Sequence, residues 1–229
     1  MKIELQHVGK KYIRQWVFHK LSYTFITGNA YAITGSNGSG KSTLLQIIAG
    51  SLLASEGKII FEQNTSIITA EKIYQYISIT APYLDIIEEM TPIEFLRFHT
   101  TFKPFIPQQT ITTVLEAVAL TQAASKQIRY FSSGMKQRLK LAQVLFSDTP
   151  VMLLDEPCTN LDKAGIDMYH QLIDTYAKNK IIIVSSNDPV EYSFCNQIIY
   201  MKNFNAIDSS SKPTPTQLPQ QHLIDQNLK

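Results

Sequence analysis

The chain has 229 residues, of which 44% are hydrophobic and 17% charged, the balance of a globular protein able to bury a core. Its net charge of +2 gives no overall field that favours nucleic acid, so we expect no nucleic-acid partner. Two cysteines are too few for a disulfide framework and fit a reducing compartment. No apolar run approaches the ~20 residues that a membrane span needs.

Strand-like and helix-like segments alternate along the chain, which predicts an α/β fold with a mostly parallel sheet. In chain order we predict strands at residues 3–8, 21–26 and 30–34 and a helix at 43–49. A turn at 55–57 and short strands at 58–61 and near 76–80 follow.

The pattern becomes helical after Thr91, a suitable N-cap followed by Pro92 in the first turn. The next helix is predicted from Ser132 to residue 146, then a buried strand at 151–154, a helix at about 163–178 and a strand at 181–184. We expect one unit at 1–205, with a helical subdomain at about 90–135, and a polar, flexible tail at 206–229.

The segment between the strand at 30–34 and the helix after it matches the phosphate-loop pattern G-x-x-x-x-G-K-[ST] at every fixed position. Its glycines let successive backbone N–H groups converge on phosphate oxygens, and the helix N-terminus adds positive charge. The pattern predicts a nucleoside triphosphate site made by Gly35, Ser36, Asn37, Gly38, Ser39, Gly40, Lys41, Ser42 and Thr43. Lys41 would have a catalytic role as the charge on the outer phosphates.

Two carboxylates follow the buried strand at 151–154, at the strand end where α/β sheets place their ligands. We expect Asp155 and the Ser42 hydroxyl to hold Mg²⁺, and Glu156 to accept a proton from the attacking water. Alone, such a pair could equally cap a helix. Together with the phosphate loop, the magnesium site is the favoured interpretation.

The segment Phe131-Ser132-Ser133-Gly134-Met135 lies shortly before that strand and resembles the LSGGQ signature of ABC (ATP-binding cassette) ATPases. Residues 159–162, which end in Asp162, resemble the D-loop of the same family. Tyr12 stands where the family places an aromatic ring that stacks on adenine, although Trp16 is a competing candidate. The resemblance covers about residues 3–201. It implies a P-loop NTPase core with a small N-terminal antiparallel β part and a helical insert.

The resemblance also implies how such a protein works. Two cassettes would dock head to tail, so that the signature residues 132–135 and Asp162 of one face the ATP bound by the other. The chain would be the ATP-hydrolysing subunit of a transporter, peripheral on the cytoplasmic face of the membrane and acting on a separately encoded permease. Two alternatives remain open: a soluble ABC ATPase not coupled to transport, and an ATP-sensing regulatory module with little hydrolysis.

The chain departs from the family pattern at two places. Residues 77–90 contain no Gln, although the family has one there that reaches Mg²⁺ and water, and Asn187 stands where the family has a His. An Asn amide donates a hydrogen bond but carries no charge, so we expect slower hydrolysis. Residues 83–89 could accept a permease helix through Tyr83, Leu84 and Ile87, with the acidic residues selecting a basic partner, or could be an ordinary amphipathic loop.

Overall fold

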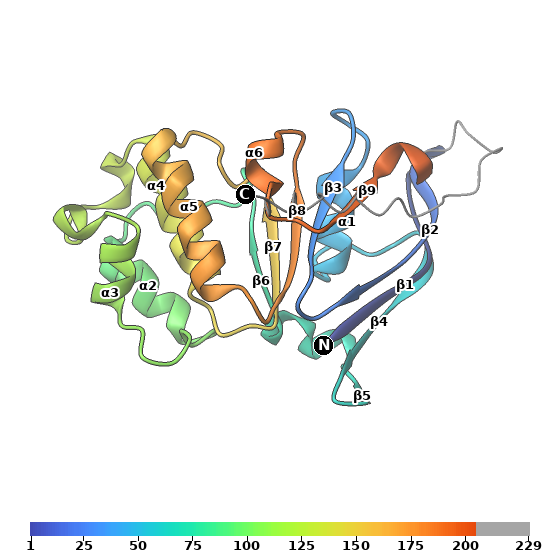
Figure 1. Ribbon diagram of the computed structural model, residues 1–229, viewed down its shortest axis with the longest axis horizontal. Helices are drawn as coiled ribbons and strands as arrows, with labels where there is room; N and C mark the ends of the chain where they lie inside the picture. Colours follow the sequence, from blue (N-terminus) through green and yellow to red (C-terminus); the bar gives the residue numbers. More distant parts are fainter. Residues whose placement is uncertain (205–229) are drawn as a thin grey trace, which may run out of the picture.

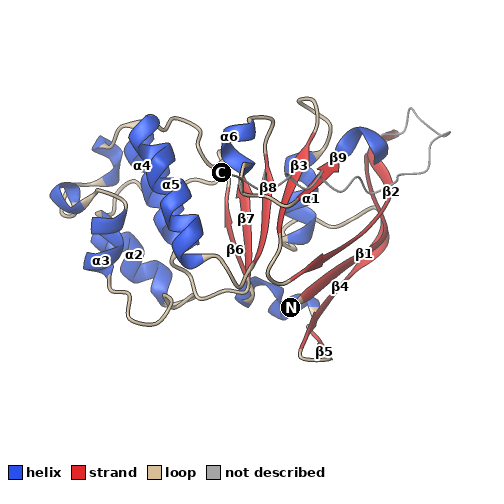
Figure 2. Cartoon of the chain, viewed as in Figure 1, coloured by secondary structure: helices blue, strands red, loops and turns tan. Residues whose placement is uncertain are grey.

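The structure, a computed structural model, describes residues 1–204, which form two β-sheets and a set of helices (Figures 1 and 2). The predicted tail at 206–229 lies outside the described residues. One sheet lies in the middle of the molecule, with the second sheet on one side and most of the helices on the other.

The described elements are as follows. The strands are β1 (Lys2–Tyr12), β2 (Gln15–Ile26), β3 (Ala30–Thr34), β4 (Glu56–Gln63), β5 (Ser66–Ile67), β6 (Ile77–Thr80), β7 (Val151–Asp155), β8 (Ile181–Ser185) and β9 (Gln197–Tyr200). The α-helices are α1 (Lys41–Ile48), α2 (Pro92–Thr100), α3 (Ile111–Ala117), α4 (Ser133–Leu145), α5 (Lys163–Tyr176) and α6 (Pro189–Tyr192). Short 3-10 helices are η1 (Ala70–Gln75), η2 (Thr121–Ala123), η3 (Ile128–Tyr130) and η4 (Met201–Phe204).

The central sheet has the strand order β6-β7-β8-β3-β9, and each neighbouring pair is parallel. Every residue of β7 and β8 is buried, because both faces of the sheet are covered. Met152 and Leu154 of β7 pack in a cluster with α4 and α5, whereas Val151 and Leu153 face a second cluster with α1 and the other sheet. The predicted α/β class is confirmed.

The second sheet is antiparallel, with the order β2-β1-β4-β5. Gly57 was expected in a turn but lies inside β4, beside an irregularity in the pairing of β1 with β4 between Gln6 and Gly9. Its φ is 75°, and a Cβ would lie 2.4 Å from the His7 carbonyl oxygen. Gly57 therefore marks a point where two backbones approach closely within a sheet, a use of glycine that resembles a turn in sequence.

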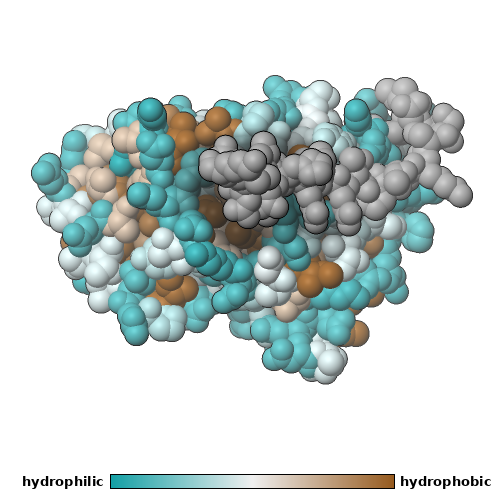
Figure 3. Space-filling model, in the orientation of Figure 1, coloured by the Kyte–Doolittle hydropathy of each residue, from teal (hydrophilic) through white to brown (hydrophobic). Residues whose placement is uncertain are grey.

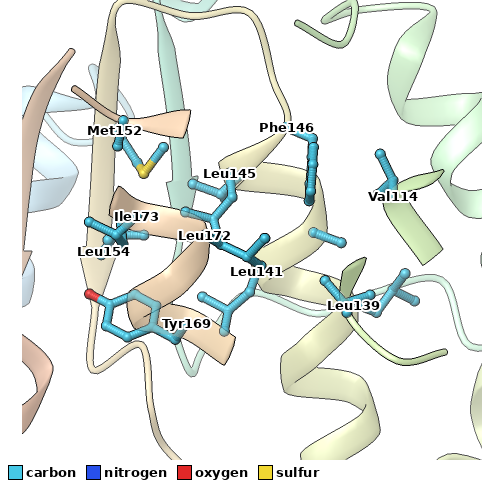
Figure 4. Packing of buried hydrophobic residues seen from close by; sticks show 14 of the residues in the cluster. Val114, Leu139, Leu141, Leu145, Phe146, Met152, Leu154, Tyr169, Leu172 and Ile173 are labelled. Carbon is cyan, nitrogen blue, oxygen red and sulfur yellow. The ribbon is translucent and has the colours of Figure 1, made fainter. Parts of the chain in front are cut away.

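The helical segments begin where their capping residues predict. Thr91 caps α2 in a capping box with Glu94, and Ser132 caps α4 by accepting a hydrogen bond from Met135 N at 3.2 Å. Helices α2, α3, α4 and α5 share one buried apolar cluster, in which Leu139, Leu141 and Leu145 project from α4 (Figure 4). Strand β9 was not predicted.

Among residues 1–204, no helix combines the length and the apolar character required to cross a bilayer. On the face shown in Figure 3, hydrophilic residues predominate, and the hydrophobic areas are small and separated. This is the surface expected of a protein whose large apolar side chains are mostly taken up by its two cores.

Leu141 tests the packing of the cluster around α4. It is fully buried, so Leu141→Ala should lower the free energy of unfolding by about 2–5 kcal/mol, since a cavity remains where the side chain was. The matched control is Leu53→Ala: Leu53 is 83% exposed, and its loss should change stability by less than about 0.5 kcal/mol. Urea unfolding followed by circular dichroism measures both. Equal effects would contradict the assigned packing.

His99 predicts a dependence of stability on pH. It is buried on α2 with Nε2 2.8 Å from Ser147 Oγ, and burial, with the nearby Lys103 charge, lowers its pKa from 6.5 to about 4. As the pH falls, His99 is therefore protonated in the unfolded chain before it is protonated in the folded chain. The contribution of His99 to the free energy of unfolding is fully present above pH 6.5 and falls by about 3 kcal/mol as the pH drops to about 4. His99→Gln should remove this part of the slope in urea unfolding between those pH values. Identical slopes in the two proteins would refute it.

Candidate functional site

The loop at residues 35–40 connects β3 to α1 and ends at Gly40, the N-cap of the helix. Gly40 is left-handed, with φ 97°, and a Cβ there would lie 2.6 Å from Val17 Cγ1 and 2.9 Å from Phe18 Cδ1. No side chain caps α1, so its first backbone N–H groups have no side-chain acceptor. Together with the positive end of the helix, these groups form a site for phosphate oxygens.

Lys41 lies within this loop. Its side chain is buried, and Nζ donates to the carbonyl oxygens of Gly35 at 2.7 Å and Ser36 at 3.4 Å. The ion pairs within residues 1–204 do not include Lys41. A buried ammonium group held only by carbonyl oxygens favours an anion beside it. The loop thus offers a phosphate group both backbone donors and a fixed positive charge.

Asp155 ends β7 and pairs in register with Ser185 of β8. It is 2% exposed, and its Oδ1 has no hydrogen-bond partner. A buried carboxylate oxygen without a donor is costly, which points to a cation as its partner.

The donor set fits Mg²⁺ bound together with phosphate. Ser42 follows Lys41 in α1, and its hydroxyl and the Asp155 carboxylate are hard oxygen donors. Within residues 1–204, no group of three or more His, Cys, Asp or Glu side chains could hold a metal ion by itself. This suits magnesium, which commonly takes one or two protein ligands and completes its shell with water and substrate phosphate.

Glu156 and Asn187 follow the neighbouring strands β7 and β8. Glu156 is an exposed residue with φ 45°, an uncommon conformation for a residue with a side chain, and its N–H donates to Ser185 O at 2.9 Å. Asn187 Oδ1 accepts from Gly35 N at 3.1 Å, and its Nδ2 lies 3.4 Å from Asn37 Oδ1. The structure therefore brings Asn187 directly against the phosphate loop.

The signature residues lie at a separate place in the same chain. Ser132, Ser133, Gly134 and Met135 line a cavity of about 670 Å³ at the start of α4, and no residue of the loop at 35–43 contributes to it. Asp162 lines the same cavity. Within one chain, the signature residues therefore lie apart from the loop at 35–43.

Asp162 is fixed by two interactions. Its Oδ1 accepts from Gly165 N at 2.8 Å as the N-cap of α5, and from Arg138 Nη2 of α4 at 3.0 Å. These bonds, first that of Gly165 and then that of Arg138, lower the pKa of its carboxyl group. The start of α4 and the D-loop segment are therefore held together.

Two residues that the sequence did not single out hold the chain after Glu156. Gln137 Nε2 donates to Pro157 O at 2.6 Å, and Glu191 Oε1 accepts from Cys158 N at 2.8 Å. Both side chains are buried. Burial is the main cause that raises the pKa of Glu191. Gln and Glu are usually exposed, so the sequence alone does not indicate that Gln137 and Glu191 are buried, and only the packing reveals it.

Tyr83 is 45% exposed, so the docking surface on which we expected it stays a prediction. It also lies close enough to Asp155 to respond to its charge. Burial, more than Asp155, raises the Tyr83 pKa. Tyr83 comes from the segment that lacks the expected Gln, and that absence was the signal available in the sequence.

Tyr12 lies at the end of β1 and is 51% exposed. Lys10 Nζ is 5.1 Å from the centre of its ring, and Lys11 Nζ is 5.3 Å from the ring centre of Trp16. Each of the two rings therefore has a lysine ammonium group over it, and both rings remain candidates for stacking on a nucleotide base.

Comparison with known proteins places this geometry in a family. The ABC transporter family model matches residues 18–159. The uncharacterized ABC transporter ATP-binding protein YybJ of Bacillus subtilis is 31% identical over 218 residues, which cover 92% of this chain and 96% of the relative. The cytochrome c biogenesis ATP-binding export protein CcmA of Brucella abortus is 31% identical over 189 residues, which cover 81% and 85%.

The fold has close counterparts among solved structures. A putative ABC transporter ATP-binding protein from Pyrococcus furiosus superposes with a TM-score of 0.74 at 22% identity, covering 90% of this chain and all of the other. At this identity the likeness establishes the fold, and the roles of individual residues depend on the geometry described above.

Proposed function

We propose that this chain, which belongs to the ABC transporter family of ATP-binding proteins, binds ATP with Mg²⁺ and hydrolyses it to drive a separately encoded membrane permease. The observation that carries the proposal is the buried Lys41 ammonium inside an uncapped helix N-terminus, with a carbonyl cradle and no carboxylate partner within residues 1–204. Backbone donors of residues 35–43 would bind the β- and γ-phosphates, and Lys41 would offset their charge.

Hydrolysis needs a water molecule placed in line with the γ-phosphate and a group that takes its proton. We assign the proton to Glu156, because its left-handed backbone turns the residue out of the strand and its carboxylate is exposed. Ser42 and Asp155 would hold Mg²⁺, which neutralises charge on the phosphate oxygens. Asn187 would donate its amide to a phosphate oxygen.

Tyr83 offers an explanation for how the chain works without the family's Gln. Tyr83 lies close enough to Asp155 to respond to its charge, and its hydroxyl would orient water on the metal-binding side of the site. A phenol can donate and accept a hydrogen bond, as water positioning requires, but it reaches fewer partners than an amide. This supports a slower ATPase rather than an inactive one.

The signature residues support action as a dimer. Ser132–Met135 and Asp162 line a cavity that also includes Arg138, which pairs with Asp162, and Lys126, whose positive charge favours an anionic ligand. The loop at 35–43 of the same chain does not reach it. A second cassette, identical or different, would bring its own ATP to this cavity and close over it.

A role in transport is supported by the relatives. CcmA of Brucella abortus is named an ATP-binding export protein. In this chain, no helix within residues 1–204 is long and apolar enough to span a membrane. Coupling to a separate permease would place the chain on the cytoplasmic face of the membrane, where ATP is available.

Lys41→Ala tests nucleotide binding. Loss of the ammonium removes the charge that faces the phosphates, so ATP affinity measured by calorimetry should fall by roughly 100-fold. Lys72→Ala is the matched control, because it removes an exposed lysine outside the loop and should leave affinity within about threefold. Affinity that survives the change of Lys41 would overturn the proposed site.

Glu156→Gln and Tyr83→Phe test hydrolysis. Glu156→Gln should reduce phosphate release by about 100-fold or more while ATP still binds, since the proton acceptor is lost. Tyr83→Phe should reduce it by about tenfold, because only a water-orienting hydroxyl is removed. A wild-type protein that turns over no faster than Glu156→Gln, with the permease present, would instead favour an ATP-sensing module.

A further inference from the structure

The loop that follows β6 borders a small cavity between the edge of the central sheet, α2 and α4. Its volume is about 170 Å³, and its polar lining includes Thr80, Asp85, His99, Lys103, Lys140 and Gln143. Cavities that hold nucleotides or other small ligands are commonly about 300–1,000 Å³. This one has room for the end of a side chain and a few waters.

Two lysines dominate the charge of this cavity. Lys103 Nζ donates to Ile77 O at 2.6 Å, and Lys140 Nζ lies 3.4 Å from Ala81 O and 3.3 Å from Pro82 O. The ion pairs within residues 1–204 include neither lysine. Burial lowers the pKa of both, which means that each ammonium group gives up part of its hydration.

The other titratable groups around the cavity offset only part of this charge. Asp85 is the one carboxylate in the lining; it is exposed, and its negative charge acts on Lys140. His99 is neutral near pH 7, with its pKa at about 4. Lys136, on the same helix as Lys140, already pairs with Glu88. The cavity therefore keeps an excess of positive charge.

A buried hydroxyl adds a hydrogen-bonding group. Thr80 is 2% exposed, and its Oγ1 has no hydrogen-bond partner. Thr80 lies on the same face of β6 as Ser78, whose Oγ bonds Val144 O of α4, so Thr80 faces the α4 side of the sheet. A hydroxyl and two ammonium groups together suit a carboxylate.

Exposed apolar side chains lie on the segments that line the cavity. Leu84 lines it and is 36% exposed, and Ile87, three residues later, is 39% exposed. Phe98 and Phe102, which flank His99 and Lys103 in sequence, are exposed and stack edge to face at 5.2 Å. Exposed apolar residues around a polar centre are typical of a protein interface.

From the sequence we expected the acidic residues of this segment, including Glu88 and Glu89, to select a basic partner. In the structure, each of these two residues already forms an ion pair within the chain. Glu88 pairs with Lys136, and Glu89 pairs with Arg129 at 3.4 Å. The cations left for a partner at this surface are Lys103 and Lys140. The selection of a basic partner by Glu88 and Glu89 stays a prediction, and the two lysines favour an acidic group of the partner beside them.

We propose that the cavity receives an aspartate or glutamate side chain of the membrane partner, carried on a segment whose apolar residues pack against Leu84 and Ile87. This inference rests on the proposed function, because it assumes that the partner is a membrane protein. The carboxylate would lie between the two ammonium groups and accept from Thr80. It would supply the hydrogen-bond partner that Thr80 Oγ1 lacks and an ion pair for the two lysines, which have none within residues 1–204.

Carbodiimide cross-linking tests the chemistry, because it joins a lysine amine directly to a carboxylate in contact with it. The protein is bound to membrane vesicles from cells that naturally contain it, treated with the carbodiimide, digested and analysed by mass spectrometry. We expect Lys103 or Lys140 joined to an Asp or Glu in a cytoplasmic segment of a membrane-spanning protein. The internal pair Lys136–Glu88 serves as the positive control for the reaction.

Charge removal gives the second measurement. Vesicle binding by Lys103→Gln/Lys140→Gln should fall by roughly tenfold or more, and Lys103→Arg/Lys140→Arg should retain most of it. The matched control, Lys20→Gln/Lys178→Gln, removes two exposed lysines elsewhere and should bind as the wild type does. ATP affinity and melting temperature, measured on each variant, identify a change caused by misfolding.

The outcomes separate the two proposals. Wild type that fails to bind the vesicles overturns both. Wild type that binds, with equal binding by the double Gln variant and no cross-link from either lysine, overturns the cavity proposal and leaves the proposed function standing. The cavity proposal is also overturned if Lys103 and Lys140 are cross-linked only to a second copy of this chain or only to residues of the same chain.

Discussion

The phosphate loop depends on contacts that come from outside the central sheet. Val17 and Phe18 of β2 lie so close to Gly40 that no side chain would fit between them and the loop, and Met201 lies 3.6 Å from the same point. The antiparallel sheet and the segment after β9 therefore hold the backbone in the conformation that leaves the α1 N-terminus uncapped. The capacity of the loop to bind phosphate therefore depends on how the two sheets pack, because this packing keeps the glycine-rich backbone in its curled conformation.

The central sheet then brings the remaining groups to the same edge. β7 and β8 are neighbours, and both end beside the loop, so Asp155, Glu156 and Asn187 arrive there without long connections. Gln137 and Glu191 fix the chain beyond Glu156 from α4 and α6. Asp155, Glu156 and Asn187 are thus positioned by strand ends and by contacts from neighbouring helices, so their geometry does not depend on the stiffness of a single loop.

The sequence predicted the parts of this arrangement that depend on local pattern. The apolar runs of β7 and β8, the caps at Thr91 and Ser132 and the loop at 35–42 all have a signal within a few residues. Strand β9 has none, because its Gln197–Tyr200 run is short and only partly buried. Gly57 was assigned to a turn because a close approach between strands and a turn both require glycine.

Charges were predicted less well, since ion pairs join residues far apart in sequence. Nothing near Glu88 and Glu89 reveals that Lys136 and Arg129, about forty or more positions later, neutralise them. The same holds for Tyr83, which responds to the charge of Asp155 although about seventy positions separate the two residues. Spacing within the sequence shows which charges exist, whereas the fold determines which of them remain for a ligand or a partner.

The loop after β6 connects two surfaces that would otherwise be independent. Tyr83 lies close enough to Asp155 to respond to its charge, and the next two residues, Leu84 and Asp85, line the lysine cavity. Lys140 Nζ contacts the carbonyls of Ala81 and Pro82, immediately before Tyr83. A carboxylate that draws on Lys140 would compete with those carbonyls for the same ammonium group. A contact made by a partner would therefore change the support of the segment that carries Tyr83, within two residues of the site it affects.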